Sequence, residues 1–183
     1  MSIVELNTER KRVIEDKVNA LIDKDIALRE PGFDIVKFLT TTEKFRIATA
    51  YMKNDIISLL LVDDIKLLEP QKTHKLIIVE QHYDELDNSV AIKRFLVACQ
   101  YAHYILHKNH KKQYAYEITR KSNMDDIEAE YFARCLLIQS NILNEILSLN
   151  FIKELSDSSK VELISRIFRV TETIATKRLN DIL

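Results

Sequence analysis

The stretch Phe95–His107, F-L-V-A-C-Q-Y-A-H-Y-I-L-H, lies inside a predicted helix over about residues 89–108. Its spacing compares with the zinc-binding pattern H-E-x-x-H, in which two His one helical turn apart hold the metal and a Glu deprotonates the metal-bound water. Cys99, Gln100 and His103 stand at these three places. A Gln amide does not accept a proton, so Gln100 removes general-base assistance that is typically worth a factor of about 10² to 10⁴. The stretch therefore predicts a helix that retains the pattern without its base.

The composition is that of a soluble globular chain, with 183 residues, 46% hydrophobic, 30% charged and a formal net charge of −1. This length suits one domain with a real core, and the near-zero charge gives no general attraction to nucleic acid or anionic lipid. The longest apolar run, Ile56–Val62, is too short to cross a bilayer, and the charged residues near the N-terminus do not suit a signal peptide. We therefore expect a cytoplasmic protein in which Cys99 and Cys135 are buried free thiols.

Helix should dominate, because one Gly and two Pro leave few turn-forming residues. Apolar spacing predicts an amphipathic helix over 13–26 that stops at Glu30-Pro31-Gly32, followed by a short segment, 35–39, capped by Asp34. Runs rich in β-formers predict a hairpin of strands at 45–52 and 56–62 and a third strand at 76–79. Further helices are predicted at about 89–108, 124–139, 141–150 and 159–182, the last broken near Arg169. The expected fold class is α+β, mostly helical, with a small antiparallel sheet.

Three separated blocks of the chain resemble one known family. Residues 94–107 resemble its R-F-x-x-A-H-E-L-G-H-Y-x-L-H signature, residues 128–137 its E-A-N-x-F-A-x-x-L-L block, and residues 164–179 a tail of two short helices around an F-G-V-S turn. The chain thus resembles the ImmA/IrrE metallopeptidases, which cleave or control repressors in mobile elements and stress responses. The resemblance implies a single domain, 1–183, with the sheet packed on a helical zincin-like core and a C-terminal helix-turn-helix-like tail, 159–183, packed on that domain.

The resemblance also implies a set of metal ligands. In that family a Glu of the second block supplies the third ligand, and Glu128 is the matching carboxylate, with Asp125 a second candidate. A Cys99 thiolate binds zinc, but its sulfur lies closer to the backbone than an imidazole nitrogen, so a metal on Cys99 and His103 would move away from Glu128. Structural roles compete with ligation: a core filler for Cys99, a hydrogen-bonded relic for His103 and a helix N-terminal carboxylate for Glu128. We expect no cofactor, and if zinc binds, these three residues are its ligands.

The function that needs no restored chemistry is a catalytically inactive pseudoprotease that acts as an interaction or regulatory module. Its partner would be a protein, such as a transcriptional repressor of a phage or mobile element or a toxin–antitoxin component. An extended segment of that partner would add to the sheet edge at 76–80, where Ile78 lies. The partner would also contact Gln100, His103 and Tyr104 in the vestigial pocket.

Two other functions remain open from the sequence. One is an active zinc endopeptidase that uses the Cys99, His103 and Glu128 ligands. The other is a DNA-binding regulator whose C-terminal helices carry four cations, Arg166, Arg169, Lys177 and Arg178. A basic run at 108–112, followed by aromatic residues, is either a nucleic-acid contact or the solvated end of a helix. We favour the pseudoprotease and expect a protein partner, with neither nucleic acid nor membrane.

Overall fold

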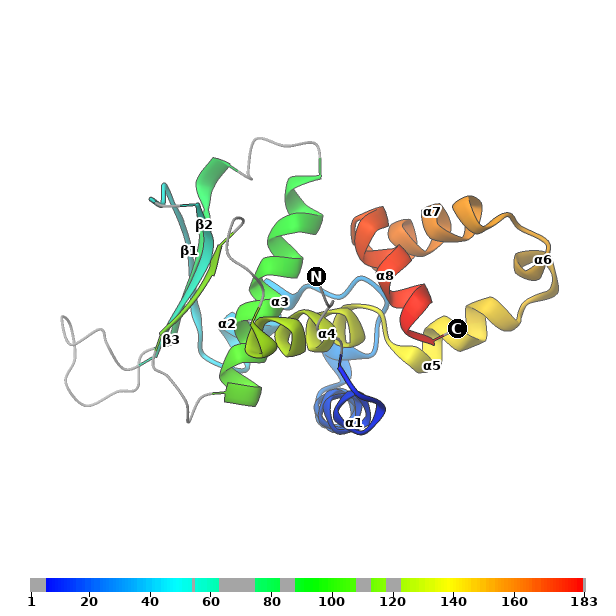
Figure 1. Ribbon diagram of the computed structural model, residues 1–183, viewed down its shortest axis with the longest axis horizontal. Coiled ribbons are helices and arrows are strands. Elements are labelled where there is room, and N and C mark those ends of the chain that lie inside the picture. Colours follow the sequence, from blue (N-terminus) through cyan, green and yellow to red (C-terminus); the bar gives the residue numbers. More distant parts are fainter. Residues whose placement is uncertain are drawn as a thin grey trace.

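The computed structural model describes residues 6–53, 55–62, 75–82, 88–107, 113–117 and 123–182. Figure 1 shows a sheet at one end, the long helix α3 (Ser89–His107) beside it, and α4 (Met124–Leu137) crossing toward further helices at the other end. Helix α3 packs against strands β2 and β3 and against α4, so it lies at the centre of the molecule. The α+β, mostly helical class predicted from the sequence is confirmed.

The N-terminal elements follow their local signals. Helix α1 (Thr8–Lys24) begins after Asn7, whose side chain accepts a hydrogen bond from Arg10 N at 2.8 Å. Its buried face consists of Ile14, Val18 and Ile22, the spacing of an amphipathic helix. The short 3₁₀ turn η1 (Ile26–Leu28) then leads to α2 (Ile35–Thr41), which Asp34 caps as predicted.

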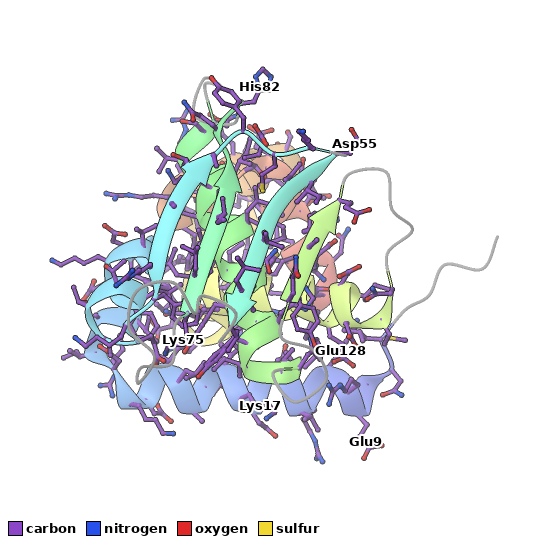
Figure 2. All side chains as sticks on the ribbon, turned by 90° about the vertical axis from the view of Figure 1, so that its left-hand side faces the viewer. Glu9, Lys17, Asp55, Lys75, His82 and Glu128 are labelled. Atoms are coloured by element: carbon purple, nitrogen blue, oxygen red, sulfur yellow. The ribbon has the colours of Figure 1, made fainter. Side chains whose placement is uncertain are left out.

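The sheet has four strands in the order β1-β3-β2-β4: β1 (Arg46–Ala50), β2 (Ile56–Val62), β3 (Lys75–Glu80) and β4 (Gln113–Glu117). Strand β1 runs parallel to β3, whereas β2 runs antiparallel to both β3 and β4. The row Leu60, Ile77 and Tyr114 is buried on the face that α3 covers. Figure 2 looks onto the opposite face, which no described helix covers.

The predicted hairpin of β1 with β2 is wrong, because β3 lies between these strands and makes the sheet mixed. The two most apolar strands, β2 and β3, take the middle, while the shorter and more polar β1 and β4 take the edges. The same order corrects the predicted edge at 76–80. Ile78 is paired with Ala48 on one side and Leu59 on the other, so β3 offers no free backbone edge to a partner.

Strand β4 was not predicted from the sequence, although Gln113–Glu117 alternates polar residues with Tyr and Ala. The run is short and follows the basic segment 108–112, which lies outside the described residues. The side chain of Tyr114 is buried beneath the sheet, and Tyr116 donates a hydrogen bond to Glu130 at 2.6 Å. Tyr114 therefore lies inside the protein, and Tyr116 is partly buried against the core.

The C-terminal helices are α5 (Ser140–Ser148), α6 (Asn150–Lys153), α7 (Asp157–Phe168) and α8 (Glu172–Ile182). The predicted break near Arg169 is confirmed, since Arg169 adopts a left-handed φ of 52° between α7 and α8. Val170 N then donates to Ser165 O at 3.0 Å, which closes the end of α7 in the manner usually left to glycine. Helix α8 packs against both α7 and α4.

Candidate functional site

The motif helix α3 is buried from Arg94 to His103 and again at His107. Because strands cover one side and α4 the other, even its polar side chains lie inside the protein. Tyr101, near the middle, makes edge-to-face contacts with Phe38, Phe45 and Phe132, at centroid distances of 5.8–6.3 Å. The motif residues are thus set into the buried core.

The last turn of α3 brings two histidines together. The Nδ1 atoms of His103 and His107 lie 3.2 Å apart, and both side chains are about 1% exposed. The Tyr114 ring stacks on His103 at a centroid distance of 4.4 Å, and its hydroxyl donates to His107 O at 2.8 Å. Strand β4 therefore fixes the position of this histidine pair.

Glu128 connects the histidines to α4 and α1. Its Oε2 lies 2.9 Å from His107 Nε2, and its two oxygens accept from Nε and Nη2 of Arg10, the Nε bond measuring 2.6 Å. Burial opposes ionisation of Glu128, but the hydrogen bonds from Arg10 and His107 outweigh it and hold its pKa below the usual value. Glu128 is therefore an ionised carboxylate, both of whose oxygens are already hydrogen-bonded.

Two further acids extend this cluster at longer range. Asp126 Oδ1 lies 3.6 Å from His103 Nε2, and Asp125 Oδ1 lies 3.9 Å from His107 Nε2. Asp126 also forms a capping box with Asn123 that starts α4. The helix start that places Glu128 beside the histidines thus uses one of the nearby acids for its own cap.

Cys99 and Gln100, one turn earlier on α3, are completely buried. Burial, with a smaller contribution from Glu130, raises the pKa of the Cys99 thiol well above its usual value, which favours the neutral thiol over the metal-binding thiolate. Gln100 Nε2 donates to Ser58 Oγ of β2 at 2.8 Å, while its Oε1 is buried and has no partner among the described residues. This amide is fixed to the sheet where the zinc pattern places a base.

The four residues predicted to contact a partner do not form one surface. Gln100 and His103 are both 0% exposed, so a partner reaches them only if the protein opens. Tyr104 is half-buried, packs on Phe45 and lies 5.0 Å from Lys75 Nζ, while Ile78 lies in a central strand. Direct contact with this set remains a prediction that needs a conformational change.

The cations of the predicted DNA-binding tail are mostly used within the chain. Arg178 is completely buried and donates to Ile138 O, Glu15 and Ser140. Arg166 pairs with Glu162 at 2.6 Å, and Lys177 lies 3.4 Å from Glu130. These contacts favour a packing role for α7 and α8.

Arg10 and His107 are the members of the site that the sequence-based prediction missed. His107 had a visible signal, because His103 and His107 are four residues apart and so share one helix face. Arg10 had none, since it lies 118 residues before Glu128 in the chain and only the tertiary fold joins them.

The side chains present do not fit a catalytic zinc. Glu128 is occupied by Arg10 and His107, Cys99 favours the neutral thiol, and Gln100 replaces the base. Within the part of the chain that the structure describes, no three His, Cys, Asp or Glu side chains are arranged so that they could hold a metal ion.

Comparison with known proteins points to one family. A family model described as "Peptidase_M78: IrrE N-terminal-like domain" matches residues 70–180. No curated protein matches the chain. Among the described helices, none has the length and apolar character needed to cross a membrane.

Proposed function

The chain belongs to the IrrE N-terminal-like family of peptidases, and from this premise we propose that it is a catalytically inactive member, a pseudoprotease that acts by binding another protein. The partner class that we propose is a transcriptional repressor or a similar regulator of a phage or mobile element. The match over 70–180 covers the motif helix, the Glu128 block and the C-terminal helices, so the peptidase-like fold is present.

The observation that carries the proposal is the state of Gln100. Peptide hydrolysis on this scaffold needs a proton acceptor beside the attacking water, and the Gln100 amide cannot take that role at any working pH. Its Nε2 is bound to Ser58 at 2.8 Å in the core, and this bond holds it in place. The loss of a general base alone lowers the rate by a factor of about 10² to 10⁴.

A second argument for inactivity concerns the metal. A bound zinc would activate water and polarise the scissile carbonyl. Of the three ligands suggested by the sequence, Cys99, His103 and Glu128, two are unsuited to a metal, because Glu128 is engaged by Arg10 and the protonated thiol of Cys99 is favoured. These observations weigh against the alternative of an active zinc endopeptidase.

A peptidase assay tests the inactivity. The purified chain is incubated with a mixed peptide library and added Zn²⁺, with His103→Ala as the matched control, and products are measured by mass spectrometry. We expect the same background cleavage from both proteins. Cleavage by the native chain that EDTA stops and His103→Ala abolishes would establish the endopeptidase instead.

The proposed partner surface is the outer edge of β4. Among the described strands β4 pairs only with β2, and its Tyr114 rests on His103, so this edge borders the vestigial site. An extended segment of a partner can add to such an edge through backbone hydrogen bonds. The edge of β4 takes the place of the central strand β3, which the sequence-based prediction had chosen.

Two alanines in one cross-strand row test this surface. Ala115 of β4 and Ala48 of β1 lie at opposite edges of the sheet, in the row that runs through Ile78 and Leu59. A lysine at an edge blocks the addition of a strand. We expect Ala115→Lys to lower the recovery of a repressor-class partner in pull-downs from the native host, while Ala48→Lys leaves it unchanged. Equal recovery with both variants would remove β4 as the partner surface.

A further inference from the structure

Arg10 lies outside the residues that match the family model but contacts a residue inside them. It belongs to α1, outside the matched residues 70–180, yet it contacts Glu128, the carboxylate that the sequence resemblance matches to the family's third metal ligand. Figure 2 shows Glu128 just above α1, the helix that crosses below the sheet. The N-terminal segment therefore contributes a cation to a site that is otherwise built from α3 and α4.

The contact engages the whole carboxylate. Arg10 Nε donates to Oε1 at 2.6 Å and Nη2 donates to Oε2, while His107 Nε2 lies 2.9 Å from Oε2. Two parallel N–H···O bonds between a guanidinium and a carboxylate are stronger and more directional than a single bond. A metal ion that used Glu128 would compete with these donors and would meet the positive charge of Arg10.

The backbone of α1 holds Arg10 in this position. Arg10 N donates to the capping side chain of Asn7 at 2.8 Å, so the residue lies in the ordered first turn. The same helix is attached to α4 at a second point, where Tyr131 donates to Glu15 at 2.7 Å. Because α1 is fixed at both places, the Glu128 contact is formed by a helix docked on α4.

We propose that Arg10 is a built-in substitute for the metal cation, holding Glu128 in place and excluding a metal ion from the third-ligand position. The inference rests on the proposed pseudoprotease, and it adds a second barrier to metal binding beyond the replaced motif residues. Restoring the motif alone should then leave zinc binding impaired. Removal of Arg10 as well should release Glu128 as a ligand.

Zinc titration of three full-length variants tests this point. The first carries Cys99→His and Gln100→Glu, the second adds Arg10→Met, and the third adds Arg12→Met instead, which removes an exposed cation from the same helix. We expect Arg10→Met to tighten zinc binding by about 10- to 100-fold, the equivalent of one charge-assisted hydrogen bond. Arg12→Met should leave the affinity within about threefold of the double variant.

The comparison is repeated in the native background, with Arg10→Met against Arg12→Met, so that poor folding of the restored motif does not decide the result. Circular dichroism and thermal unfolding establish that each chain is folded. Equal zinc affinity of the Arg10 and Arg12 variants in both backgrounds, including no binding by either, would overturn the inference. Failure of the proposed function looks different, because it requires zinc and peptidase activity in the native chain with Arg10 in place.

Discussion

Each end of helix α3 carries a buried network of polar contacts, but the two networks use different kinds of partner. Near the N-terminus, Arg94 donates to three backbone carbonyls, those of Phe33, Phe168 and Arg169. Near the C-terminus, His103, His107, Glu128 and Arg10 contact one another through side chains. Both ends belong to the stretch that resembles the family signature, so one motif supplies residues for two different kinds of contact.

The Arg94 end of α3 holds parts of the fold together, whereas the histidine end forms the candidate site. Carbonyl acceptors are fixed by the backbone, and Arg94 uses them to join α3 to the turn at Gly32 and to the α7–α8 connection, which are otherwise far apart in sequence. Burial, with a smaller contribution from Arg169, lowers the pKa of Arg94 to about 10, so it stays charged near neutral pH. At the other end of α3 the Arg10 side chain is 37% exposed, so water can replace part of its interaction and its removal should cost less.

Loss of core packing between the two ends of α3 should cause the largest loss of unfolding free energy. Phe132 is completely buried against Tyr101, and Phe132→Ala should lower the free energy of unfolding by about 3–5 kcal/mol, as for other large core truncations. Phe151, which is 63% exposed, is the matched control, and Phe151→Ala should cost below about 0.5 kcal/mol. Urea denaturation measures both. A loss below about 1 kcal/mol for Phe132 would contradict the packing of α4 on α3.

Removal of the Arg94 side chain should cause the next largest loss of unfolding free energy. Arg94→Met leaves three carbonyls without their donor, so we expect a loss of about 2–4 kcal/mol in unfolding free energy. Arg29 also donates to two backbone carbonyls but is exposed to water, and Arg29→Met should cost below about 1 kcal/mol. Similar losses of unfolding free energy from the two variants would mean that the buried hydrogen bonds of Arg94 stabilise the fold no more than the exposed ones of Arg29.

Substitutions at the histidine end of α3 should lower the unfolding free energy less. Arg10 is partly exposed, so its ion pair with the nearly buried Glu128 is weakened by solvent, and Arg10→Met should lower the unfolding free energy by about 1–2 kcal/mol. Arg12→Met, on the same helix, should change it by about 0.5 kcal/mol or less. Thermal unfolding of the pair compares them directly. A cost for Arg10→Met above that of Arg94→Met would reverse the contrast between the two ends.

The smallest effect is a dependence on pH. The pKa of Glu128 is below its ordinary 4.5 in the folded protein, so its ionised form stabilises the fold above that value. This contribution is lost as the pH falls through the folded pKa, because the carboxyl then takes up a proton. The stability advantage of the native chain over Glu128→Gln should therefore be constant near neutral pH and shrink below about pH 4. An advantage that grows on acidification would contradict the Arg10–Glu128 pairing.

Local signals explain how much of the fold the sequence could predict. The cap at Asp34, the break at Arg169 and the apolar β2 run each depend on neighbours within a few residues, and each was confirmed. The order of strands was not predictable in this way. It depends on which strands are buried most deeply, so β3 was placed at an edge although it lies between β1 and β2.

In the candidate site too, local sequence patterns found some residues, and only the tertiary fold reveals the others. His103 was found from the motif spacing and Glu128 from the family resemblance of its block, and the structure brings both to one cluster. Cys99 and Gln100 were found too, but their complete burial follows from packing on both sides of α3. Arg10 could not be found at all, because no periodicity or motif connects α1 with α4 across 118 residues.

The zinc content of the native protein tests whether this peptidase-like fold holds a metal ion. The full-length chain is purified without chelator and measured by elemental analysis beside Cys99→Ala and His103→Ala variants. The account predicts far less than one zinc per chain in all three proteins. About one zinc per native chain, lost in both variants, would contradict this expectation and show that Cys99 and His103 hold a metal ion.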